Sequence, residues 1–202
     1  MSERYRASAR EHLTSLAEVL TRSADEISAW AASYAALVIE TFERDGRLLM
    51  CGNGGSAATV EHVATEYVVR LKRERAPLPA IALTAGSAQL TASANDFGYE
   101  RAFLRTLRAF GREGDLLVLH STSGESENLL VAAAEAKGLG IGTVGLLGLG
   151  GGRLADLVDL AISVPTADTA LIQEVHLCVE HAVADLVDAH FADGRPDPKR
   201  KD

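Results

Sequence analysis

Residues 47–70, RLLMCGNGGSAATVEHVATEYVVR, constrain the fold more than any other stretch of this chain. The apolar run 48–51 predicts a short buried strand. It ends at a glycine-rich turn, residues 52–56, where glycine permits positive φ and a close approach of the backbone to a ligand. Helical periodicity follows over 56–71, with Ser56 expected as the N-cap. A strand, a glycine turn and a helix N-terminus together predict an anion-binding site, because free N–H groups and the helix dipole favour negative charge.

His62 and Glu66 lie one turn further along this predicted helix. They are four residues apart, so their side chains share one helix face. From the spacing alone, a weakly stabilising surface pair explains them equally well. Beside a phosphate cradle, however, the pair indicates an enzyme that acts on a phosphorylated small molecule.

From residue 47 onward, predicted strands and helices alternate. Near-continuous apolar strands separated by helices predict a parallel sheet that is covered on both faces. We expect strands at 47–52, 79–84, 115–121, 141–147 and 159–164, and helices at 56–71, 86–94, 99–111, 126–138, 152–157 and 168–191. In such folds, ligands bind at the carboxyl ends of the strands.

The third strand ends in a second loop of this kind, Ser121-Thr122-Ser123-Gly124-Glu125-Ser126. Four hydroxyl groups in six residues, leading into a helix, offer neutral donors and backbone N–H groups to a phosphate. Ordinary turns and caps are the alternative explanation. Two such loops at one edge of a sheet favour phosphate.

Two amphipathic helices, 3–22 and 25–44, precede the first strand, and we expect them to form a helical hairpin. Their apolar faces need a partner, and a second subunit is one natural solution. We expect a single domain over 1–192, made of the N-terminal helices (1–45) and an α/β core (46–192). The charged, proline-containing tail 193–202 is expected to be flexible.

Composition narrows the class of protein further. The chain has 202 residues and a formal net charge of −8, which argues against a nucleic-acid-binding protein. The two cysteines, Cys51 and Cys178, lie in apolar segments and are expected to be small core residues, which points to a reducing compartment. The N-terminus lacks a signal-like apolar core, and no run approaches 18 apolar residues. We therefore expect a soluble cytoplasmic protein that binds neither membrane nor nucleic acid.

The motifs, taken together, resemble those of sugar isomerase (SIS) domain proteins. They are the run 51–56 (CGNGGS), the segment 95–98 (NDFG), the loop 121–126 (STSGES) and the segment 173–176 (QEVH). The last segment is similar to that of the sedoheptulose-7-phosphate isomerase (phosphoheptose isomerase) branch. The resemblance implies a flavodoxin-like three-layer sandwich with a five-stranded parallel sheet, assembled as a homotetramer with active sites at subunit interfaces.

The resemblance also implies roles for individual residues. Glu66 and His181 match the catalytic pair, and several relatives bind zinc through positions matching His62, Glu66, Gln173 and His181. The implied substrate-binding residues are Asn53, Gly54, Gly55, Ser56, Asp96, Ser121, Thr122, Ser123, Ser126 and Gln173. One zinc ion per subunit is the implied cofactor. His176 is expected to have at most a supporting role, and His120 lies close to the phosphate loop.

The implied reaction converts D-sedoheptulose 7-phosphate to D-glycero-D-manno-heptose 7-phosphate, for heptose biosynthesis. Moving a carbonyl from C2 to C1 requires a proton to leave C1 and another to reach C2, which a carboxylate such as Glu66 and a second acid–base group such as His181 can perform. Two alternatives stay open: a non-catalytic SIS-domain regulator that binds a protein partner, and an isomerase of another ketose phosphate. The short chain argues against a glutamine-dependent aminating enzyme, which needs an additional domain.

Overall fold

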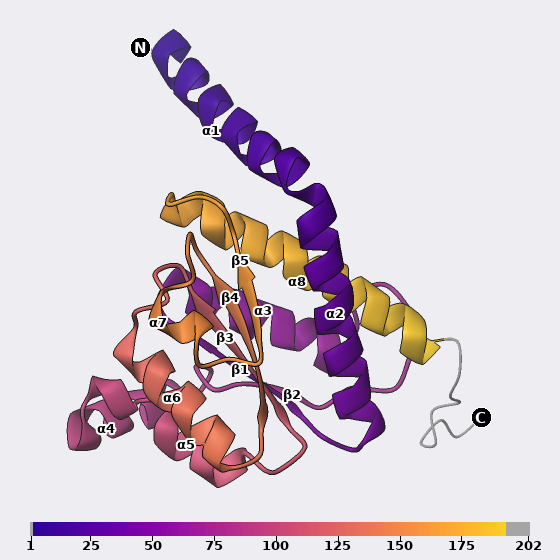
Figure 1. Cartoon of the computed structure of the whole chain (residues 1–202), viewed down its shortest axis with the longest axis vertical. Helices are drawn as coiled ribbons and strands as arrows, with labels where there is room; N and C mark the ends of the chain where they lie inside the picture. The colour runs from indigo at the N-terminus through magenta and orange to yellow at the C-terminus, as the bar shows by residue number, and fades with distance from the viewer. Residues whose placement is uncertain (1, 193–202) are drawn as a thin grey trace.

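The computed structural model describes residues 2–192, which form one sheet between two layers of helices (Figure 1). The strands are β1 (Leu48–Gly52), β2 (Ala80–Ala82), β3 (Leu116–Ser121), β4 (Gly142–Leu147) and β5 (Leu160–Ser163). The helices are α1 (Ser2–Arg22), α2 (Ala24–Glu43), α3 (Gly55–Val68), α4 (Ser87–Phe97), α5 (Leu104–Phe110), α6 (Glu127–Gly138), α7 (Gly152–Ala155) and α8 (Thr169–Ala192), with a 3-10 turn η1 (Tyr99–Arg101).

All five strands are parallel, in the order β2-β1-β3-β4-β5, which confirms the predicted sheet and its flavodoxin-like arrangement. Every residue of β1 and β3 is buried. This burial explains why these strands read as continuous apolar runs rather than as alternating ones. Each predicted strand lies at the expected place in the chain.

Successive residues of the strands enter two different cores. Leu48 and Met50 of β1 pack in the core beneath α2, α3 and α8. Leu49 and Cys51 point to the other face and pack with α5, α6 and α7. This alternation gives the three layers, with α2 and α8 on one side of the sheet and α5 and α6 on the other (Figure 1).

The predicted N-terminal hairpin does not form. The chain does not reverse between α1 and α2, and α1 projects away from the body of the protein (Figure 1). The single residue between the helices, Ser23, has φ −107° and ψ 13°, and Ile27 N–H still donates to Ser23 O at 2.8 Å. One residue near the bridge region of backbone angles bends a chain but cannot turn it back on itself.

The expectation for the two cysteines is only partly met. Both cysteines are free and Cys51 is buried, but Cys178 is exposed on the outer face of α8, so its assignment to the core was wrong. Within residues 2–192, no helix combines the length and apolarity needed to cross a membrane. The single-domain division stays a prediction, and the tail predicted to be flexible, 193–202, lies outside the described residues.

Candidate active site

The glycine turn and the serine loop lie side by side because β1 and β3 are neighbours. Gly52, which ends β1, pairs in register with His120 of β3, one residue before Ser121. The strand order reverses at this pair, since β2 lies beyond β1 whereas β4 and β5 lie beyond β3. Open parallel sheets bind ligands at such a switch point, so the two predicted phosphate-binding segments meet where a ligand is expected.

The glycine turn starts α3 one residue earlier than predicted. Gly54, with φ +57°, occupies the N-cap position, so Ser56 is a buried first-turn residue and not the cap. Gly55 allows close packing, because a Cβ at this position would lie 2.5 Å from Oε1 of Gln173 and would displace its amide. The Gln173 side chain on α8 therefore rests against the beginning of α3.

Asn53 is fixed by two side chains that the sequence did not bring to notice. Its Oδ1 accepts hydrogen bonds from the Tyr99 hydroxyl and from Asn128 Nδ2, both at 2.8 Å, and its Nδ2 donates to Asn128 Oδ1 at 3.0 Å. Asn128 is buried in the first turn of α6. These bonds connect the glycine turn to the start of α6, although neither Asn128 nor Tyr99 belongs to a motif that could have revealed them.

The serine loop is folded by its own hydroxyl groups. Ser121 Oγ accepts the Gly124 N–H at 2.9 Å, and Ser123 Oγ accepts the Glu125 N–H at 3.2 Å. Ser126 occupies the N-cap position of α6, but its hydroxyl makes no capping hydrogen bond. The loop therefore has a defined shape and presents hydroxyl groups beside the N-terminus of α6, an arrangement suited to an anion.

Acidic side chains beside this loop are neutralised by one arginine. Arg153 Nε donates to Glu125 at 2.7 Å and its Nη2 donates to Glu127 at 3.1 Å. These bonds lower the pKa of Glu125 and raise the pKa of Arg153. The pairing reduces the repulsion that two free carboxylates would exert on a phosphate at the loop.

His62, Glu66 and His181 form a cluster where α3 and α8 pack against each other. Their ligand atoms all lie within 4.8 Å of one another. His62 Nε2 is 3.2 Å from Glu66 Oε1, and the rings of His62 and His181 have centroids 5.2 Å apart. Two imidazoles and a carboxylate are a donor set that suits zinc and other transition metals. The side chain of His62 is 46% exposed and that of Glu66 15%, so solvent reaches the cluster.

The cluster and the glycine turn are at different heights along α3. Ten residues separate Ser56 from Glu66, about 15 Å of helix rise, and eight residues separate Gln173 from His181, about 12 Å. Gln173 contacts Gly55, so its amide lies nearer to the glycine turn than to His181 along α8. This position favours the predicted substrate-binding role of Gln173, and its role as a fourth metal ligand stays a prediction.

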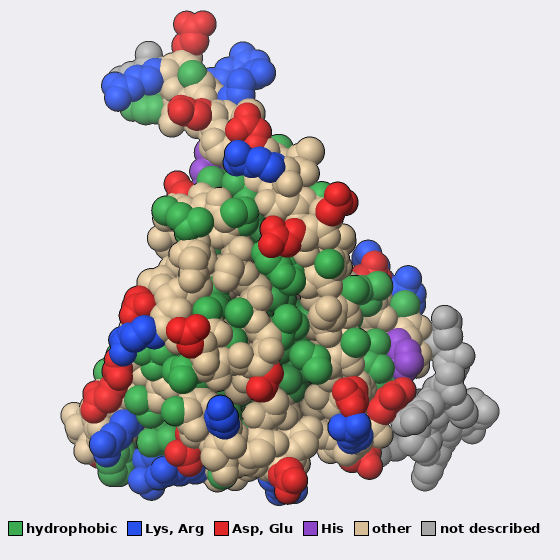
Figure 2. All heavy atoms as spheres, viewed as in Figure 1, with side chains coloured by type: hydrophobic (Ala, Val, Ile, Leu, Met, Phe, Trp, Pro, Cys, Tyr) green, Lys and Arg blue, Asp and Glu red, His purple; other side chains and the backbone are tan. Residues whose placement is uncertain are grey.

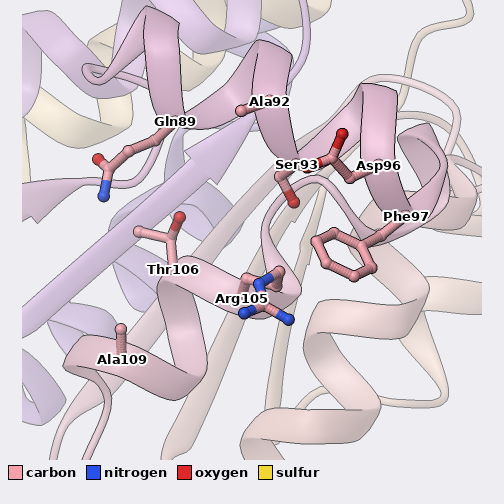
Figure 3. A pocket seen from close by; sticks show the side chains of 8 residues that line it. All are labelled: Gln89, Ala92, Ser93, Asp96, Phe97, Arg105, Thr106 and Ala109. Carbon is pink, nitrogen blue, oxygen red and sulfur yellow. The ribbon is translucent and has the colours of Figure 1, made fainter.

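Asp96 lies at a separate pocket of about 440 Å³ between α4 and α5 (Figure 3). Its carboxyl group accepts a hydrogen bond from Asn95 Nδ2 at 2.9 Å, and the Arg105 guanidinium stacks 4.4 Å from the centre of the Phe97 ring in the same pocket. The structure thus gives Asp96 an exposed position next to an arginine. Its predicted place near the sugar stays a prediction.

A buried polar cluster, whose pairing no sequence motif indicates, lies beneath the site. His120 Nε2 is 2.7 Å from Glu180 Oε1, and the Tyr34 hydroxyl donates to both Glu180 oxygens at 3.2 Å. His176 packs edge-on against His120 and shares a hydrogen bond with Leu147 O at 3.1 Å. Burial lowers the pKa of His176 to about 3, so the ring is neutral and its Nε2–H donates. His176 thus packs in the interior, and its supporting role stays a prediction.

Comparison with known proteins gives a consistent result. Residues 5–148 match the family model described as SIS domain. The chain is 48% identical over 171 residues to the phosphoheptose isomerase of Roseiflexus sp. (strain RS-1), which covers 85% of this chain and 87% of that protein. It is 43% identical over 175 residues to the phosphoheptose isomerase of Helicobacter pylori (strain P12), covering 87% and 91%.

The fold is equally similar to solved structures. The phosphoheptose isomerase of Neisseria gonorrhoeae superposes with a TM-score of 0.87 at 34% identity, covering 92% of this chain and 99% of that one. The phosphoheptose isomerase of Francisella tularensis gives a TM-score of 0.88 at 32% identity, with coverages of 92% and 98%.

Proposed function

The chain belongs to the SIS-domain family, among the phosphoheptose isomerases, and we propose that it converts D-sedoheptulose 7-phosphate to D-glycero-D-manno-heptose 7-phosphate. It is a sugar-phosphate isomerase. The observation that carries the proposal is the cluster of His62, Glu66 and His181. It lies on two helices, α3 and α8, whose beginnings touch at the predicted phosphate-binding edge of the sheet.

The phosphate of the substrate binds at the serine loop. The hydroxyl groups of Ser123 and Ser126 and the N-terminus of α6 supply donors, and Ser56 and Ser121 line the same switch point between β1 and β3. These donors are neutral, so they bind the phosphate dianion through hydrogen bonds rather than through an ion pair. Asn53 and Gln173 lie next to this edge and orient the hydroxyl groups of the sugar.

Isomerisation is a transfer of protons within the substrate. Glu66 takes a proton from C1 of the ketose, the electrons of that C–H bond form the C1–C2 double bond of an enediol, and the C2 oxygen receives a proton. The hydroxyl proton on the C1 oxygen then leaves as the C1 carbonyl forms, and a proton is returned to C2. His181, whose ring lies against His62 in the same cluster, carries protons between the C1 and C2 oxygens.

A metal ion fits the same cluster. His62, Glu66 and His181 would hold it, and zinc is the ion that we propose, with Gln173 as a candidate fourth ligand. When bound, zinc supplies a Lewis acid that polarises a carbonyl oxygen. A carboxylate bound to metal is a weaker base, so Glu66 as base and Glu66 as ligand are competing roles.

We further propose that the protein works as a homotetramer with active sites at subunit interfaces. Among the residues of α1, only Val19 is buried, although a helix of 21 residues depends on packing for most of its stability. Figure 2 shows α1 standing clear of the body, above a face on which hydrophobic side chains gather. Val69, directly after α3, and Leu186 of α8 are also exposed apolar side chains that a second subunit would cover.

Light scattering tests the assembly. A tetramer has four times the 21.4 kDa mass of the chain. Replacing the exposed Leu13 of α1 by glutamate should dissociate it, whereas a monomeric wild type would exclude the tetramer.

A regulator without catalytic activity is the competing function. The carboxylate–histidine cluster disfavours it, because protein binding does not require an acid–base cluster that is accessible to solvent.

The reaction itself is tested with sedoheptulose 7-phosphate in deuterated water, followed by NMR. An aldoheptose 7-phosphate with deuterium at C2 would support isomerisation through an enediol. Binding without conversion would favour the regulator, and neither binding nor conversion would point to another ketose phosphate.

A further inference from the structure

Three buried polar residues each stand next to a site residue in the sequence. Tyr67 follows Glu66 on α3, His120 precedes Ser121 at the end of β3, and Glu180 precedes His181 on α8. All three are at most 1% exposed. Successive residues of a helix point about 100° apart, and successive residues of a strand point to opposite faces. Each of these three neighbours therefore points in a different direction from its site residue, into the buried layer between the sheet and the helices.

His120 and Glu180 connect two of these elements directly. Their side chains are 0% exposed, and 2.7 Å separates His120 Nε2 from Glu180 Oε1. The Tyr34 hydroxyl of α2 donates to the same carboxylate. Burial, followed by the effect of Glu180, raises the pKa of Tyr34 well above its usual value, so this hydroxyl stays a donor.

Stability does not explain this arrangement well. Burying a carboxylate and an imidazole is costly, and well-packed apolar residues of similar size often give an equally stable or more stable protein. The surroundings are already apolar, with Val118, Val175 and Val179 in the same core. Tyr67 OH and the Nδ1 atoms of His120 and His176 are buried and lack a hydrogen-bond partner among the described residues, which adds to the cost.

What the pair provides, and apolar packing does not, is a link of fixed length and direction. We propose that His120 and Glu180 are positioning residues for the isomerase reaction, which hold the serine loop on β3 at a set distance from His181 on α8. The inference rests on the proposed function. It applies whether a site takes its loop and its His181 from one copy of the chain or from two, because both must be in place in every copy.

The decisive variant replaces both partners, His120→Leu with Glu180→Leu. It leaves no unpaired charge, but the buried Tyr34 hydroxyl loses its acceptor, which lowers stability. Removing the buried carboxylate and imidazole offsets this cost, so the protein should fold, and circular dichroism and thermal unfolding check that it does. A displacement of about 1 Å at a reacting centre can cost about 100-fold in rate. We therefore expect kcat/KM for sedoheptulose 7-phosphate to fall about 100-fold at an almost unchanged melting temperature.

Two further variants separate positioning from general packing. His120→Gln keeps an N–H donor near the position of Nε2 and should recover most of the activity that the double variant loses. Asp115→Asn disturbs another buried carboxylate, at the opposite end of the same strand, and should lower stability while kcat/KM of the folded protein stays within about twofold.

A crystal structure of the double variant gives a readout that does not depend on the substrate. We expect the Ser121–Ser126 loop to shift by about 1 Å relative to His181. A folded double variant with wild-type kcat and KM, or with an unmoved loop, would overturn the positioning role. If the wild type itself does not convert the sugar, the proposed function fails, and the loop displacement alone decides the inference.

Discussion

The two ends of the parallel sheet treat polar groups in opposite ways. At the amino end, Asp115 of the turn before β3 accepts hydrogen bonds from Arg47 N at 2.8 Å, Arg47 Nη2 at 2.9 Å and Arg112 N at 2.9 Å. Asp159 accepts in the same way from the N–H and the hydroxyl of Thr143, both at 2.8 Å. The oxygens of these carboxylates are therefore occupied by hydrogen bonds within the protein.

At the carboxyl end, and at the His62–Glu66–His181 cluster further along α3, polar groups keep donors and acceptors that the protein does not use. The Ser126 hydroxyl makes no capping bond, Gly54 exposes the beginning of α3, and His62 is half exposed. Groups that are fully paired contribute to folding, whereas groups with spare donors and acceptors can bind a ligand. The comparison predicts that substitutions at the two ends affect different measurements.

The largest effect is expected at Glu66. Glu66→Gln removes the base but keeps the size of the side chain, so turnover should fall about 10²- to 10⁴-fold with little change in melting temperature. The matched control is Glu61→Gln, an exposed glutamate on the same helix, which should keep wild-type turnover. Near-wild-type turnover of Glu66→Gln would exclude Glu66 as the base.

The opposite result is expected at the amino end. Asp115→Asn should lower the free energy of unfolding by about 3 kcal/mol, the low end for a broken buried pair, because the Arg47 side chain is still 20% exposed. Urea unfolding measures the loss, and Glu113→Gln, an exposed neighbour, is the control. Lost catalysis in folded Asp115→Asn would abolish the distinction between the two ends.

Measuring zinc affinity tests whether the His62–Glu66–His181 cluster binds a metal. His62→Ala removes one of three ligands and should weaken zinc binding in calorimetry about 100-fold or more. Loss of an outer-shell partner alone costs about 10- to 100-fold, and a direct ligand contributes at least as much. His190→Ala, which removes an exposed histidine on α8 paired with Glu43, should leave zinc binding unchanged. If both variants bind zinc equally, the cluster is not the metal site, and Glu66 is then free to act only as the base.

The serine loop should affect substrate binding more than turnover. Ser123→Ala deletes one hydrogen bond to a charged phosphate, so KM should rise about tenfold while kcat changes little. Ser28→Ala, at an exposed serine of α2, provides the baseline. An unchanged KM for Ser123→Ala would count against phosphate binding at this loop.

The last effect concerns pH and stability alone. Because burial lowers the pKa of His176 from 6.5 to about 3, the unfolded chain binds a proton that the folded protein does not bind between these values. His176 therefore stabilises the fold fully above pH 6.5, and this contribution is lost as the pH falls towards 3. His176→Gln keeps an N–H for Leu147 O without titrating, so its melting temperature should decline less between pH 6.5 and 4. Parallel curves for the two proteins would contradict this expectation.

Most of the fold was predictable because its signals are local. The apolar runs that became β1 and β3, the glycine turn at 52–56 and the spacing of His62 and Glu66 are each contained within a few residues. The N-terminal hairpin was wrong because amphipathic periodicity shows which face of a helix is apolar but not the angle at which the next helix leaves. That angle depended on the backbone of Ser23.

The sequence by itself therefore determined where the strands lie along the chain, where the glycine turn and the serine loop follow them, and the identity of the chemical groups, since each depends on neighbours along the chain. Only the tertiary structure decided which distant groups meet. His181 reaches His62 across more than a hundred residues, and Glu180 reaches His120 across 60. The physical reason is that a buried polar group finds its partner through the packing of whole helices on a sheet, and residue spacing along the chain carries no record of that packing.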